Sequence, residues 1–257
     1  VGYFGPQLVQ NGDFSQEGSE LVTNGNFATD SDWTLTQATI SGGYLNISTT
    51  DGSFSGARQF NVFTVGKIYL VSLEISNIVG TIEVDVNSGG NYGQTFTTNG
   101  SKSFYLKAEN TDIEVKRAFG AEQVISATID NVSVKEVGQD WTLGPGWSIG
   151  EDKAIVTNAP ALYQRLTQPS LSFTLNSTYK ISVTCSEYSS GFIYLRKPRG
   201  SEADTSLRID NVGTFVFTLK ALTELTEFAL AIGPIGTDLS ISNISVIEII
   251  GDKPRID

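Results

Sequence analysis

The chain has 257 residues, a formal net charge of −11 and a sequence pI near 4.5. Such an acidic chain lacks the basic surface that binds nucleic acids or anionic membranes. No apolar run approaches the roughly 18 residues that cross a bilayer, so we expect neither nucleic acid as a partner nor membrane insertion. The absence of histidine excludes His-based triads and most zinc sites. The single cysteine, Cys185, alternates with Ile181 and Val183 and is predicted to be a small buried residue.

A short phrase occurs twice at the front of the chain. Leu8-Val-Gln-Asn-Gly-Asp-Phe14 is echoed by Leu21-Val-Thr-Asn-Gly-Asn-Phe27. We assign residues 1–19 to a lead-in segment and interpret the first copy as the remnant of another, upstream module. The chain contains no methionine, not even at position 1, so we expect it to be an excerpt of a longer protein.

Residues 20–137 have the pattern of an antiparallel sandwich. Stretches rich in β-branched and aromatic residues alternate in polarity, and turn signals separate them at short intervals. The predicted strands cover 68–75, 81–86, 103–108 and 112–116. We therefore expect one β-sandwich module over 20–137.

The second half repeats the first after about 112 residues. Residues 127–134 return as 239–246, residues 106–108 return as 219–221, and Tyr69 matches Tyr179. Trp33 is matched with Trp147, and both are expected to be core anchors. A period of this length is that of a whole small domain. We predict a second module over 138–250, a loop followed by a strand over 221–230, and a linker-like tail over 251–257.

These phrases carry a resemblance to a known family. The opening at 21–27, Trp33 and the closing stretch at 129–137 resemble carbohydrate-binding modules of the two-sheet jelly-roll type. Residues 134–150 and 252–257 are similar to phrases in tail-fibre and other virion proteins of tailed phages, many of them marine. The resemblance implies an all-β fold of two tandem antiparallel β-sandwich domains.

The family also implies a structural calcium ion in the first module. The ion would lie between the opening phrase and the closing strand, with Asn24, Asn26 and Asp130 as ligands. Oxygen ligands suit this hard cation. The second module has Ser242 in place of Asp130, and we read it as lacking the opening phrase, so no calcium is expected there.

Sugar binding in such modules relies on aromatic faces and on polar side chains that bind hydroxyls. Tyr92, in the Gly-rich stretch 88–93, is the leading candidate because an aromatic residue in a loop has little packing reason to exist. The other candidates lie outside obvious core alternation, and each has an alternative structural role: Gln94, Tyr44, Arg58, Tyr163, Tyr188, Trp141 and Arg196.

Catalysis has little support in the sequence. Glu83 and Asp85 are two carboxylates of the kind that glycosidases use, but their spacing is typical of the solvated face of a strand. Cys185 has no histidine to activate it as a nucleophile. We therefore predict that the chain is not an enzyme.

The leading hypothesis is a non-catalytic phage virion module, at the virion surface or otherwise extracellular, that adheres to a host cell-surface glycan. One alternative is a structural spacer or decoration module that binds other virion proteins. Another is the accessory carbohydrate-binding module of a secreted bacterial enzyme. Oligomer formation, if it occurs, is expected through regions outside this chain.

Overall fold

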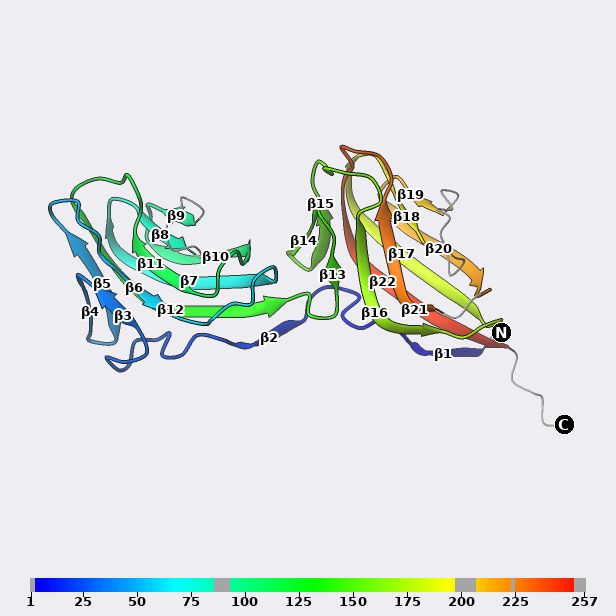
Figure 1. Cartoon of the computed structure of the whole chain (residues 1–257), viewed down its shortest axis with the longest axis horizontal. Coiled ribbons are helices and arrows are strands. Elements are labelled where there is room, and N and C mark those ends of the chain that lie inside the picture. Colours follow the sequence, from blue (N-terminus) through cyan, green and yellow to red (C-terminus); the bar gives the residue numbers. More distant parts are fainter. Residues whose placement is uncertain (1–2, 86–92, 197–206, 223–224, 252–257) are drawn as a thin grey trace. The chain divides into compact units, whose positions relative to one another are not determined.

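The computed structural model describes residues 3–85, 93–196, 207–222 and 225–251 (Figure 1). Over these residues the regular structure is made of strands that pair antiparallel, and no helix occurs. In the described part of the chain no helix is therefore long and apolar enough to span a membrane. The chain divides into two compact units, which are named here the first module (Glu17–Val137) and the second module (Val1–Gln16 with Gly138–Asp257).

The first module is a sandwich of two antiparallel sheets. One sheet has the order β10 (Gly100–Lys107), β7 (Ile68–Val79), β12 (Ile125–Val137), β5 (Tyr44–Thr49) and β4 (Ala38–Ser41), and β2 (Glu17–Glu20) also pairs with β12. The other sheet has the order β3 (Thr34–Thr36), β6 (Gly56–Gln59), β11 (Ile113–Arg117), β8 (Ile82–Asp85) and β9 (Gln94–Phe96).

The second module repeats this topology strand for strand. One sheet has the order β14 (Trp147–Gly150), β15 (Lys153–Val156), β22 (Asp238–Gly251), β17 (Thr178–Ser190) and β20 (Gly213–Lys220), and β1 (Tyr3–Gln7) pairs with β22. The other sheet has the order β13 (Thr142–Leu143), β16 (Arg165–Phe173), β21 (Leu225–Ile232), β18 (Ile193–Leu195) and β19 (Arg208–Ile209). The predicted fold class is confirmed.

Each module has a core built by alternation along its strands. On β7, Val71, Leu73 and Ile75 are buried between the sheets, as Ile181, Val183 and Cys185 are on β17. Successive side chains of a strand point to opposite faces, so one face of each sheet buries its apolar side chains. The prediction that Cys185 is buried is confirmed, and its burial raises the pKa of its thiol.

Two tyrosines show how closely the modules match. The backbone N–H of Thr64 donates to the hydroxyl of Tyr69 at 2.8 Å, and that of Thr174 donates to Tyr179 at 2.8 Å. The rings contact Phe63 and Phe173 with centroids 4.9 and 4.8 Å apart. The predicted correspondence of Tyr69 with Tyr179 therefore holds in three dimensions.

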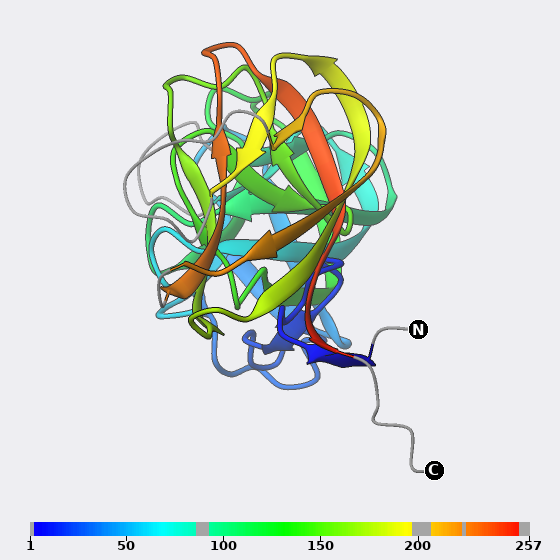
Figure 2. The same ribbon diagram turned by 90° about the vertical axis from the view of Figure 1, so that its right-hand side faces the viewer.

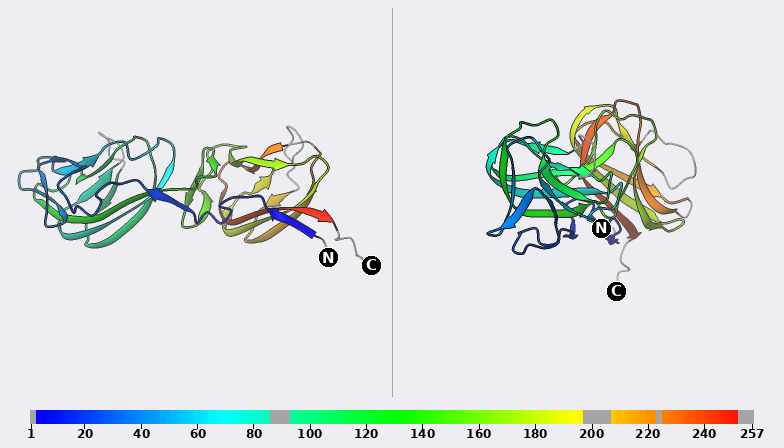
Figure 3. Two further views of the ribbon diagram at one scale, coloured as in Figure 1. Left: turned by 90° about the horizontal axis from the view of Figure 1, so that it is seen from below. Right: turned by 60° about the vertical axis from the view of Figure 1, so that its left-hand side comes forward.

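The front of the chain differs from the prediction. Residues 1–16 are not a separate lead-in, because β1 pairs with β22 along Tyr3–Gly251, Phe4–Ile249 and Gln7–Ile247. The views in Figures 1, 2 and 3 all show the blue β1 beside the red end of β22. The phrase at 8–14 is therefore the opening phrase of the second module, which is interrupted in the sequence by the first module.

The match of Trp33 with Trp147 is also corrected. In the first module the ring of Phe27 lies 5.4 Å from that of Trp33, and in the second module Phe14 lies 5.3 Å from Trp141. The indole N–H of Trp33 donates to the Asn24 carbonyl at 3.2 Å, and that of Trp141 donates to the Asn11 carbonyl at 2.9 Å. Trp141 is thus the counterpart of Trp33. Trp147 is buried as predicted, but it lies on β14, a strand of the other sheet.

Candidate functional site

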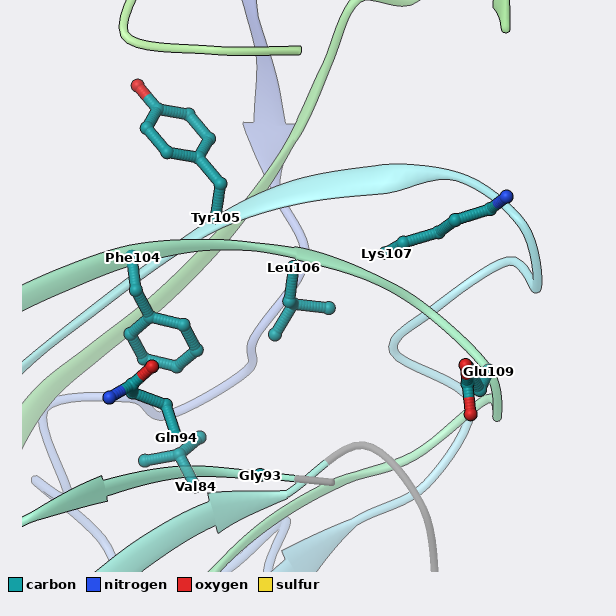
Figure 4. Close-up of a pocket in the computed structure, with 8 residues that line it drawn as sticks. All are labelled: Val84, Gly93, Gln94, Phe104, Tyr105, Leu106, Lys107 and Glu109. Atoms are coloured by element: carbon teal, nitrogen blue, oxygen red, sulfur yellow. The ribbon is translucent and has the colours of Figure 1, made fainter. Parts of the chain in front are cut away.

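A pocket opens in the first module between the edge strands of its two sheets. It has a volume of about 280 Å³. Edge strand β9 and its neighbour β8 form one wall, and edge strand β10 with the residues after it forms the other (Figure 4). Its lining residues are Val84, Gly93, Gln94, Phe104, Tyr105, Leu106, Lys107 and Glu109.

The pocket combines an apolar wall with a polar rim. Figure 4 shows Phe104 and Leu106 pointing from β10 toward Gln94 and Val84, whereas Tyr105 points to the other side of the strand. The Phe104 ring also contacts Phe96, with centroids 5.7 Å apart, which holds the wall in place. Gln94 supplies an amide and Glu109 a carboxylate, whereas the Lys107 side chain extends from β10 away from Gln94. Such a pocket suits a ligand with both C–H and hydroxyl surface.

One predicted sugar-binding residue, Gln94, lines this pocket. Tyr92, the leading candidate, lies outside the described residues. Phe104, Leu106, Lys107 and Glu109 were missed by the sequence analysis. For Phe104 and Leu106 the sequence analysis predicted only a strand over 103–108, and no sequence signal marks the place where a sandwich opens at its edge.

Arg58 has a structural role. Its Nη2 lies 2.6 Å from Oδ2 of Asp112, and its guanidinium stacks on Phe60 at 4.9 Å. Burial raises the pKa of the Asp112 carboxyl. Hydrogen bonds from Asn61, Thr111 and Arg58 lower this pKa by more than burial raises it, so the pKa lies below its usual value. Arg58 therefore ties β6 to the residue that precedes β11 and lies apart from the pocket lining.

The predicted tyrosines are dispersed. Tyr44 begins β5 and is 44% exposed, and Tyr188 on β17 donates its hydroxyl to the Gly191 carbonyl at 3.2 Å. Tyr163, just before β16, is 60% exposed. Trp141, another candidate, is buried against Phe14 and Phe228 in the core of the second module. None of these residues lines the pocket of the first module.

The turn that carries Asn24 and Asn26 lies beside β12, the strand that carries Asp130. The turn at 24–26 contacts β12, because the backbone N–H of Val132 donates to the Gly25 carbonyl at 2.9 Å. The Asn24 carboxamide, however, closes its own loop: its Nδ2 donates to the carbonyls of Thr29 and Ser31 at 2.7 and 2.9 Å.

The only acidic group of this predicted set, Asp130, accepts the backbone N–H of Asn131 at 2.7 Å. Over the described ranges, no cluster of three His, Cys, Asp or Glu residues is arranged to hold a metal ion. Two of the three predicted ligands are asparagines, which such a cluster does not include, and calcium stays a prediction from the resemblance.

The expectation that Glu83 and Asp85 lie on a solvated face is wrong. Glu83 is 3% exposed and Asp85 is fully buried. The Glu83 carboxylate accepts the backbone N–H groups of Gly93 and Phe119 at 3.2 and 3.3 Å, and Asp85 pairs with Lys116 at 2.6 Å. The alternation of β8 correctly assigns both to the outer face of the sheet, but it cannot say that other segments cover this face. Both carboxylates have structural partners.

No protein-family model matches the chain, and no curated protein matches it. Among solved structures it is similar to the N-terminal CBM22-1–CBM22-2 tandem domain of Xyn10C from Paenibacillus barcinonensis, with 11% identity and a TM-score of 0.30 over 91% of this chain and 99% of that chain.

The chain is also similar to a structure of the M60 catalytic domain with the CBM51-1 and CBM51-2 domains from Clostridium perfringens ZmpB. The identity is 10% and the TM-score 0.22 over 87% of this chain and 38% of that chain. At these TM-scores the likeness says nothing about what this chain binds.

Proposed function

We propose that this chain is a non-catalytic glycan-binding protein and that the pocket of the first module is its site. The supporting observation is the pocket itself, in which Phe104 and Leu106 face Gln94 across the open edge of the sandwich. A sugar ring offers C–H groups to the apolar wall and hydroxyls to the amide, and Glu109 supplies an acceptor at the rim.

A binding role accords better with the carboxylates of β8 than a glycosidase role does. A glycosidase needs two carboxyl groups that flank the substrate and remain free to exchange protons or attack. Glu83 holds two backbone N–H groups, and Asp85 is buried beside the Lys116 ammonium. The function proposed for the chain is therefore adhesion.

The proposed setting is the surface of a phage particle, where the chain would contact a glycan of the host cell. Two features of the sequence support this setting. Residues 134–150 and 252–257 resemble virion proteins of tailed phages, and the charge of −11 would keep many exposed copies soluble.

The experiment is a glycan-array screen of the full chain, followed by calorimetry with the best ligand. Gln94→Ala removes a hydrogen-bonding group worth about 1 kcal/mol, so we expect an affinity loss of roughly fivefold. Thr95→Ala is the matched control, because Thr95 is the exposed next residue of the same strand and is not part of the lining.

Equal losses in Gln94→Ala and Thr95→Ala, or binding that is insensitive to both, would place the site elsewhere. If the array contains no ligand, the adhesion proposal is overturned in favour of a structural spacer.

A further inference from the structure

The second module carries a cluster of arginine and tyrosine side chains on the outer face of the sheet that contains β16, β21 and β18. In the register of these strands, Ala231 of β21 lies between Arg165 of β16 and Tyr194 of β18. Two residues earlier on β21, Ala229 lies opposite Thr167, and its carbonyl accepts the backbone N–H of Arg196.

Alternation identifies this face as the outer one. Leu166, Leu230 and Leu195 are fully or almost fully buried in the core, so their chain neighbours point away from it. Neighbouring strands lie about 4.8 Å apart. The methyl groups of Ala229 and Ala231 therefore leave room on the central strand for long side chains to meet from both flanks.

Two arginines meet there on a single carboxylate. Nη1 of Arg196 lies 3.5 Å from Oε1 of Glu227, and Nη1 of Arg165 lies 3.9 Å from the same oxygen. Both distances exceed the 2.7–2.9 Å typical of a strong charge-assisted hydrogen bond. In the described part of the chain, Glu227 is the carboxylate that lies beside both guanidiniums, so the two arginines share one anionic partner there.

Two tyrosines complete the cluster. Tyr194 is 2% exposed and lies among the arginines, whereas Tyr163 is 60% exposed. Burial raises the pKa of the Tyr194 hydroxyl, and the nearby Tyr163 phenol raises it further while Arg196 and Arg165 oppose the change. Tyr163, Arg196 and Arg165 thus all act on the Tyr194 hydroxyl, and the ring of Tyr163 is presented to solvent.

The first module has the same strands but different chemistry at these positions. Its central strand, β11, carries Glu114 and Lys116 where β21 carries Ala229 and Ala231. Lys116 lies 2.6 Å from Asp85 and 3.0 Å from Glu114, so the central charges of that face are paired internally and largely buried. Among the described residues, the second module places Arg165 and Arg196, with side chains 45% and 23% exposed, beside small central residues.

We propose that the arginine–tyrosine face, formed by Tyr163, Arg165, Tyr194, Arg196 and Glu227 around Ala229 and Ala231, binds an acidic saccharide. The carboxylate or sulfate of the sugar displaces Glu227 and takes both guanidiniums, whose planar fork matches an oxyanion in a bidentate manner. The pyranose ring lies against the exposed ring of Tyr163. This site is in the second module and is separate from the pocket proposed for neutral parts of a glycan.

The test uses the full chain and three defined probes: oligogalacturonate for carboxylate, dextran sulfate for sulfate, and dextran as the neutral polymer. We expect binding to at least one anionic probe, weakened by salt, and no binding to dextran. Arg196→Gln should reduce the affinity about tenfold, the equivalent of one charge-assisted contact. Lys180→Gln is the control, because it removes the same charge from the outer face of the opposite sheet of this module.

Glu227→Gln is the more decisive variant. Since it removes the anion that competes with the ligand, it should increase the affinity about threefold or more. A purely structural ion cluster predicts the opposite, which is a lower melting temperature and no gain in binding.

Three results would overturn the proposal: no binding of either anionic probe, equal losses in Arg196→Gln and Lys180→Gln, or weaker binding by Glu227→Gln. Gln94→Ala should leave binding of the anionic probe unchanged, so failure of the pocket in the first module is distinguishable from failure of this site.

Discussion

The indole N–H of Trp141 donates to the backbone carbonyl of Asn11 at 2.9 Å, although 130 positions separate the two residues in the sequence. The equivalent bond of the first module, from Trp33 to Asn24, spans 9 positions. The same tertiary contact is therefore local in one module and very long-range in the other. The opening phrase of the second module must be held by contacts with residues that follow the whole first module.

Phe14→Ala tests this arrangement directly. Phe14 is 2% exposed and packs on Trp141, so truncation leaves a cavity and should destabilise the second module by about 3–5 kcal/mol. Calorimetry should show the second-module transition at lower temperature and the first-module transition unchanged. Phe27→Ala is the matched control and should lower the temperature of the first-module transition while leaving that of the second module unchanged. A second-module transition that is insensitive to Phe14→Ala would contradict the discontinuous assignment.

Gln168 holds the opening segment by its amide. Its Oε1 accepts the backbone N–H of Gln10 at 2.9 Å and its Nε2 donates to the Gln10 carbonyl at 2.6 Å, with the side chain 3% exposed. Gln168→Leu leaves both backbone groups without these partners and should lower the free energy of unfolding by about 2–4 kcal/mol. Urea denaturation followed by tryptophan fluorescence measures this loss.

The matched substitution is Gln59→Leu in the first module. Gln59 makes the same pair of bonds with Thr23, at 2.9 and 2.8 Å, so it should destabilise only that module. If both variants unfolded in urea like the wild type, the hydrogen bonds of Gln168 and Gln59 would not contribute to stability.

Asn24→Ala separates a structural role from a calcium-binding one. Because the carboxamide closes the loop through Thr29 and Ser31, its removal should destabilise the first module by about 1–2 kcal/mol in both calcium and chelator. Thermal melts in the two buffers measure the effect. A structural calcium ion requires a different pattern: a wild-type melting temperature that falls in chelator, and an Asp130→Asn variant that shows no such fall.

The lowered pKa of the Asp51 carboxyl makes the stability of the first module depend on pH. Hydrogen bonds from the Ser53 hydroxyl, the Ser53 backbone N–H and the Thr49 hydroxyl lower the pKa of its carboxyl from 3.8 to about 2. A group whose folded pKa is depressed contributes its full stability above its unfolded pKa and loses it as the pH falls through the folded pKa.

The stability difference between the wild type and Asp51→Asn should therefore be constant above about pH 4 and shrink toward pH 2. Melting temperatures measured at a series of acidic pH values would reveal it. A difference that is independent of pH across this interval would mean that the carboxyl is not held by these bonds.

The sequence alone determined the fold class and the content of the cores. Alternating apolar residues identified the strands, the length of the repeat identified two modules, and the match of Tyr69 with Tyr179 is confirmed by the equivalent hydrogen bonds of their hydroxyls. These inferences succeed because burial of one face of a strand is recorded locally, in a period of two residues.

Tertiary structure alone decided which opening phrase belongs to which module, which edge of a sandwich opens into a pocket, and which outer face is covered. The phrases at 8–14 and 21–27 have the same local pattern, and only pairing with β22 or β12 distinguishes them. Likewise, alternation places Glu83 and Ala231 on outer faces, but burial and charge pairing there depend on residues far away in the sequence. A local pattern specifies the face of a strand, whereas long-range contacts specify what that face meets.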